Sequence, residues 1–104
     1  MKVIWLTNAQ DALLKTAEYV GEMFGEKKQL ELLDEVELCN KLLAHHPYMG
    51  RIEPELADRA VEYRYLIVKR LNKMIYSVDN DVIIVADFWN TRRSPKNLVK
   101  GVPY

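Results

Sequence analysis

EYRYLIVKRLNKMIYSVDNDVIIVADFWNTRRSP occupies residues 62–95, and this stretch decides the fold. It contains three segments rich in β-branched, aromatic and aliphatic residues, with turn-forming residues between them. Residues 61–68 and 73–78 alternate in the manner of strands with one face toward a core. Residues 82–85 are apolar on both faces, which predicts a central strand. Asn and Asp at 79–81 predict a tight hairpin turn, since both tolerate positive φ.

The residues before this stretch predict one more strand and two helices. Residues 3–6 form a short β-type run, and Asn8 is predicted to cap a first helix that ends at Gly25. A second helix is predicted over residues 26–45, before a loop that begins at Pro47. The apolar stripe of the second helix consists of Leu30, Leu33, Val36, Leu38, Cys39, Leu42 and Leu43.

The predicted element order is β-α-α-β-β-β. Because only two or three residues connect the helices, we expect an antiparallel helical hairpin. This hairpin packs on one face of a mostly antiparallel four-stranded sheet, which is an α+β fold, and residues 1–104 form a single domain. Two helices cannot easily cover both faces of four strands. We therefore expect apolar surface on the opposite face that awaits a partner.

Charge and composition exclude several classes of function. The chain has 15 basic and 15 acidic residues, but residues 1–50 carry a net charge of −3 and residues 51–104 a net charge of +3. A basic C-terminal half can face an anionic partner, whereas a neutral total argues against strong nonspecific binding of nucleic acid. The single cysteine, Cys39, excludes an internal disulfide and is predicted to be a small buried hydrophobe. The sequence contains no membrane-length apolar run and no secretory segment, so we expect a cytoplasmic protein.

No pattern of nucleophile and base is visible, and His45-His46 has no further ligands at a useful spacing, so no metal site is predicted. What remains is a set of cations with tyrosines between them. The cations are Arg51, Arg59, Arg64, Lys69, Arg70, Lys73, Arg92, Arg93, Lys96 and Lys100, and the tyrosines are Tyr48, Tyr63, Tyr65 and Tyr76. Two interpretations stay open: a surface that holds a nucleic-acid backbone and stacks bases, or a solvated face with the tyrosines in the core.

The element order, HPYMGR at residues 46–51, EYRYLIVKRLNKMIYSV and VIIVADFWNTRRSP together resemble the RelE/ParE toxin superfamily. The resemblance covers nearly the whole chain and is strongest from residue 46 to residue 95. It implies a growth-inhibiting toxin of a type II toxin–antitoxin pair, without cofactor or metal. The toxin would be neutralised by a small cognate antitoxin whose C-terminal segment lies along its helices and sheet.

The superfamily has two mechanisms. RelE-like members cut mRNA on the ribosome and need a base, cations for the phosphorane and an acid. On that branch the resemblance implies Lys73 and Arg93 as catalytic cations, with Tyr63 or Tyr65 helping proton transfer. ParE-like members poison DNA gyrase instead.

The resemblance is closer to the ParE branch. The paired lysines before the second strand of the sheet and the tyrosine of the C-terminal helix are not present, and HPYMGR and the neutral charge also favour ParE. We therefore predict a ParE-like toxin that binds DNA gyrase, with Arg64, Arg92 and Trp89 in contact with the target or antitoxin. The alternatives are a RelE-like ribosome-dependent endoribonuclease, a plain nucleic-acid-binding module, and a toxin fold that has lost its activity.

Overall fold

The computed structural model describes residues 1–91 and Val102. The elements are β1 (Lys2–Trp5), α1 (Thr7–Phe24), α2 (Glu26–His45), β2 (Arg51–Ile52), the 3-10 helix η1 (Pro54–Leu56), β3 (Arg64–Val68), β4 (Asn72–Asp79) and β5 (Val82–Asn90). This is the predicted α+β order with one strand more, because β2 lies in a stretch predicted as loop. Neither long helix, nor any other in the described part of the chain, is long and apolar enough to cross a membrane.

The five strands form one sheet in the order β1-β5-β4-β3-β2. β5 lies between β1 and β4, as its two apolar faces predict. It pairs in parallel with β1, while the other three pairings are antiparallel. β2 is short and pairs only Arg51 with Tyr65 and Ile52 with Arg64. A register shift lies between Ile75 and Tyr76 of β4.

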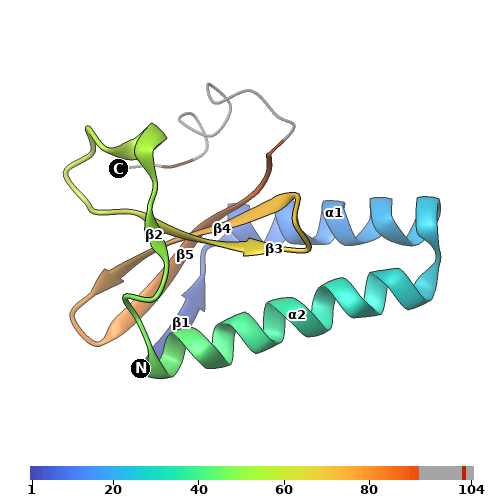
Figure 1. Ribbon diagram of the computed structural model, residues 1–104, viewed down its shortest axis with the longest axis horizontal. Coiled ribbons are helices and arrows are strands. Elements are labelled where there is room, and N and C mark those ends of the chain that lie inside the picture. The colour runs from blue at the N-terminus through green and yellow to red at the C-terminus, as the bar shows by residue number, and fades with distance from the viewer. Residues whose placement is uncertain (92–101, 103–104) are drawn as a thin grey trace.

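The two helices form a hairpin that covers one face of the sheet (Figure 1). Its buried contacts with the sheet form the main core, made of Ala9, Ala17, Leu32, Val36, Cys39, Leu43, Val68, Met74, Tyr76, Ile83, Val85 and Phe88. The indole Nε1 of Trp5 donates to Oδ1 of Asn40 at 3.0 Å and so joins β1 to α2. Gly25, at φ 94°, ends α1 and precedes α2, a conformation that costs little only for glycine.

The buried face of α2 is narrower than its sequence predicts. Leu32, Val36, Cys39 and Leu43 are buried at helical spacing, and burial raises the pKa of the Cys39 thiol. The predicted stripe was wrong for Leu30, Leu38 and Leu42, which are 51%, 54% and 38% exposed. These three leucines lie on the outer surface, where nothing in the described chain covers them fully.

Two predicted boundaries were also wrong. Asn8 does not cap α1, since the N-cap position is Leu6 and the helix already includes Asn8. The side-chain amide of Asn8 donates instead to the carbonyl oxygen of Ala86 in β5, at 2.7 Å. β3 begins at Arg64 rather than at residue 61, because the residues before Arg64 belong to a connection from β2.

The second face of the sheet is partly covered. The connection between β2 and β3 and Val102 pack on it with side chains of β4 and β5, and this second cluster contains Leu56, Tyr63, Ile75, Ala86, Trp89 and Val102. A hollow of about 580 Å³ stays open beside Ser77 and Ile84. The expectation of an uncovered face therefore holds only for part of it.

Candidate interaction site

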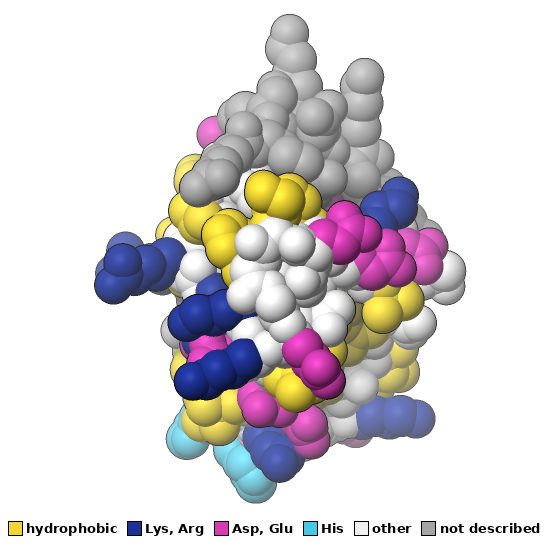
Figure 2. Space-filling view, turned by 90° about the vertical axis from the view of Figure 1, so that its right-hand side faces the viewer, with side chains coloured by type: hydrophobic (Ala, Val, Ile, Leu, Met, Phe, Trp, Pro, Cys, Tyr) yellow, Lys and Arg dark blue, Asp and Glu magenta, His cyan; other side chains and the backbone are white. Residues whose placement is uncertain are grey.

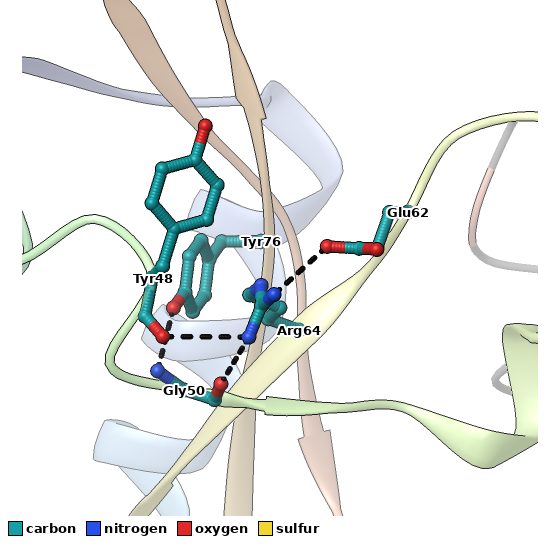
Figure 3. A network of polar contacts seen from close by, with 5 residues as sticks. All are labelled: Tyr48, Gly50, Glu62, Arg64 and Tyr76. Carbon is teal, nitrogen blue, oxygen red and sulfur yellow. Dashed lines mark hydrogen bonds and ion pairs between the residues drawn. The ribbon is translucent and has the colours of Figure 1, made fainter.

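A polar network joins the loop after α2 to the start of β3 (Figure 3). Arg64 is its centre: Nη2 pairs with Oε1 of Glu62 at 3.0 Å, and Nη1 donates to the carbonyl oxygen of Gly50 at 2.8 Å. Nη1 also lies 3.3 Å from the carbonyl oxygen of Tyr48, and the guanidinium lies 5.3 Å from the centroid of the Tyr48 ring. The Arg64 side chain is only 20% exposed. Its charge therefore holds the loop against the sheet.

Position 50 requires glycine for steric reasons. The Gly50 N–H donates to Oη of Tyr76 at 2.9 Å. A Cβ at this position would lie 2.6 Å from the same Oη and 2.7 Å from the carbonyl oxygen of Tyr65. Tyr76 is completely buried, and burial raises the pKa of its phenol. The loop reaches the sheet this closely because residue 50 has no side chain.

A second charged group lies on the other face of the sheet. Nζ of Lys73, on β4, pairs with Oε1 of Glu53 at 2.7 Å. The Glu53 side chain is 0% exposed and that of Lys73 is 17% exposed. The ammonium also lies 4.3 Å from the centroid of the Tyr65 ring and 5.7 Å from that of Trp89. Since an unpaired buried charge is costly, this pair fastens the residue before η1 to the sheet.

The loop that Arg64 holds presents apolar side chains to solvent. Tyr48, Met49 and Ile52 are 63%, 46% and 52% exposed, and Arg51 beside them is exposed too. Tyrosine, methionine and arginine are enriched at the core of protein–protein interfaces. The surface formed by Tyr48, Met49, Arg51 and Ile52, called here the β2 surface, is therefore suited to contact with another protein.

The strands and both charged groups lie within a region that matches a known family. The model for the ParE toxin of type II toxin-antitoxin system, parDE, matches residues 3–95. The chain belongs to the ParE toxin family. A solved structure described as the chromosomal ParDE TA system from P. aeruginosa has the same fold, with a TM-score of 0.68 and 17% identity over 86% of this chain and 95% of that chain. No curated protein matches the sequence.

In this ParE-family chain the predicted site residues that the structure describes lie in two places, because Lys73 and Trp89 are neighbours, with the ammonium 5.7 Å from the centroid of the Trp89 ring. Arg64 is in the loop network, and Lys73 is in the pair with Glu53. Trp89 is 4% exposed in the second cluster, and its indole N–H has no hydrogen-bond partner among the described residues. Arg92 and Arg93 lie outside the described residues. The contact or catalytic roles of these five residues stay predictions.

The sequence alone did not single out Glu53 or Gly50, and it named Tyr48 only as one of four tyrosines among the cations. Glu53 carries no local signal, because its partner Lys73 is 20 positions away. Gly50 and Tyr48 lie inside the HPYMGR motif, which was the one available hint. His45 and His46 are exposed, and no group of three metal-ligating side chains occurs in residues 1–91 and 102.

Proposed function

We propose that this toxin acts by binding DNA gyrase, without cutting RNA, and that a cognate antitoxin neutralises it. Membership of the ParE family supports the gyrase target, and the fold of the ParDE system from P. aeruginosa supports an antitoxin partner. Gyrase works in the cytoplasm, so the proposal places the protein there.

The ion pair between Lys73 and Glu53 favours gyrase binding over RNA cleavage. Ribonuclease chemistry without metal needs cations aimed at the charge that develops on the phosphate. The ammonium of Lys73 already lies 2.7 Å from a carboxylate with 0% exposure. A phosphate would have to displace Glu53 and leave that carboxylate buried without a partner, which costs several kcal/mol. Arg64 also has partners, Glu62 and the carbonyl oxygen of Gly50, although Glu62 is 56% exposed and would return to water if it were displaced.

The β2 surface supports binding to a protein. Its exposed Tyr48, Met49 and Ile52 offer apolar area that gains free energy when a partner removes it from water. Apart from Tyr48, whose ring can stack on a base, and the cation Arg51, this surface offers little to a nucleic acid, since phosphate contacts dominate its affinity.

The test is a gyrase assay with the purified protein. We expect the protein to inhibit supercoiling of relaxed plasmid and to raise the amount of cleaved DNA held by gyrase, while topoisomerase I stays active as the control. Addition of the protein encoded by the adjacent reading frame should restore supercoiling. Unchanged gyrase activity, together with codon-phased cuts in primer extension on translated mRNA, would replace this proposal by the RelE-like one.

A further inference from the structure

The end of the helical hairpin exposes three large apolar side chains, called here the hairpin-end cluster. Tyr19, Met23 and Phe24 are 53%, 61% and 63% exposed. The rings of Tyr19 and Phe24 meet edge to face, with centroids 6.4 Å apart. Figure 2 looks onto this end, where hydrophobic side chains lie between Lys and Arg on the left and Asp and Glu on the right. The cluster therefore lies between charges of opposite sign.

One side of the hairpin-end cluster is acidic. Glu18, Glu22 and Glu26 are exposed and line one hollow, and none of the described residues in that lining is Lys or Arg. Glu18 and Glu22 are four positions apart on α1, so their carboxylates lie on the same side of the helix. Like charges at this spacing repel each other, and cations from outside would stabilise them. We call these three glutamates the acidic flank.

The other side of the cluster is basic. Lys28 and Lys69 line a groove between the two helices and the turn from β3 to β4. Their Nζ atoms lie 3.3 Å and 3.9 Å from Oε2 of Glu31, the one carboxylate among the described lining residues, so two cations share a single anion. The lysine side chains are 61% and 43% exposed, and exposed pairs of this kind are weak. We call Lys28 and Lys69 the basic flank.

This arrangement of charge is complementary to itself. When two copies of the chain face each other across a two-fold axis between the flanks, each basic flank meets the acidic flank of the other copy. Removal of the two apolar clusters from water supplies free energy, and the two opposite-charge contacts fix the orientation. The β2 surface lacks this property, because Arg51 is its one charged residue and two copies of it would bring like charges together.

We propose that the hairpin end binds a second copy of this chain, so that the toxin on its own forms a two-fold homodimer. The two hairpin-end clusters pack at the centre of the interface, with one pair of opposite flanks on each side. Because the end of one helical hairpin is a small surface, we expect a concentration-dependent equilibrium of monomer and dimer. The inference does not depend on the target of the toxin.

The apolar part is tested by sedimentation of the purified toxin over a range of concentrations. We expect wild type to shift from monomer to dimer as its concentration rises, and Tyr19→Ser/Phe24→Ser to associate at least tenfold more weakly. The control is Leu38→Ser, because Leu38 is 54% exposed on α2 and lines neither the groove nor the acidic hollow. Its association constant should stay within twofold of wild type, and thermal melts check that all variants fold.

The charged part is tested by two reversals that are then mixed. Lys28→Glu/Lys69→Glu makes both flanks acidic, and Glu18→Lys/Glu22→Lys replaces two carboxylates of the other flank by ammonium groups. Each variant alone should associate at least tenfold more weakly than wild type. An equimolar mixture should form a heterodimer, because both contacts again join opposite charges. Lys41→Glu reverses a lysine that is 73% exposed and outside both linings, so it should dimerise like wild type.

Three results would overturn the homodimer: a wild type that stays monomeric up to its solubility limit, a dimer that survives both reversals, or a mixture of the two reversed variants that stays monomeric. None of them affects the proposed function, because inhibition of gyrase by the wild type is measured separately.

Discussion

Replacement of Lys73 by methionine tests whether this cation is structural. Lys73→Met keeps an unbranched side chain but removes the ammonium that lies 2.7 Å from Oε1 of Glu53. The Glu53 side chain has 0% exposure, so its carboxylate would lose its partner without gaining water. Removal of one partner of a buried pair costs about 3–5 kcal/mol, and we expect the low end because Lys73 itself reaches solvent. For a chain of this size a loss of ~3 kcal/mol lowers Tm by about 12–24 °C.

The matched control is the Glu53→Leu/Lys73→Met double variant, which replaces both charged side chains by apolar ones of similar volume. Because replacing a whole buried pair is often nearly neutral, we expect this variant to recover most of the stability that Lys73→Met loses. Urea unfolding of the two single variants and the double variant completes a double-mutant cycle. A loss below ~1 kcal/mol in Lys73→Met, or a double variant no more stable than that single one, would refute the reasoning. The folded double variant should still inhibit gyrase, whereas a nuclease that depends on Lys73 would no longer cleave mRNA.

Three further predictions concern the Arg64 network. Gly50→Ala should cost about 1–3 kcal/mol in a thermal melt, because its Cβ would lie 2.6 Å from Oη of Tyr76; an unchanged Tm contradicts this. Tyr76→Phe, as a separate single variant, should lower the free energy of unfolding by ~1–3 kcal/mol, because it leaves the Gly50 N–H unpaired. Burial raises the pKa of Tyr76 above 10.0, so the unfolded state loses its phenol proton first and the free energy of unfolding falls as pH rises from that value toward the folded-state pKa. Urea midpoints measured over this pH range should show this fall for the wild type, and the part of it due to residue 76 should be missing in Tyr76→Phe. Arg64→Lys keeps the charge but cannot contact Glu62 and Gly50 at the same time, so we expect ~1–2 kcal/mol of destabilisation. The loop should also be cut faster by a protease that cleaves after residue 48. Equal digestion rates of the variant and the wild type would contradict this role of Arg64.

The sequence predicted what depends on local pattern. Residues 26–45 form α2 with the predicted bounds, and the Asn80 turn has the predicted positive φ of 54°. Helical periodicity between Gly25 and Pro47 was sufficient to place α2, and the residue types of the turn were sufficient for Asn80. The same reasoning placed Asn8 at a helix cap, because an asparagine before an apolar run usually caps. It failed there because the helix begins earlier, with Leu6 at the N-cap position, so that Asn8 already lies in the first turn, where its side-chain amide donates to the carbonyl oxygen of Ala86.

The site was harder to predict than the fold. Arg64 and Lys73 were identified as cations of interest, but whether they are free or paired depends on Glu62 and on Glu53, and nothing in the local sequence marks these two carboxylates. Lys69 and Arg70 have φ values of 49° and 66°, which their residue types do not predict. The turn between β3 and β4 therefore has a shape that the residue types of Lys69 and Arg70 do not account for.

Because β1 pairs in parallel with β5, the sheet of this toxin can be completed only late in the synthesis of the chain. Lys2 pairs with Val82, so the first strand made waits for a partner that lies 80 residues later. At a translation rate of about 5–20 residues per second, that wait lasts about 4–16 s. Pairings that span so much of the chain also slow folding. A nascent chain that stops before β5 therefore lacks the strand that joins β1 to the rest of the sheet, and the antitoxin proposed above would meet a complete toxin only after β5 has been made.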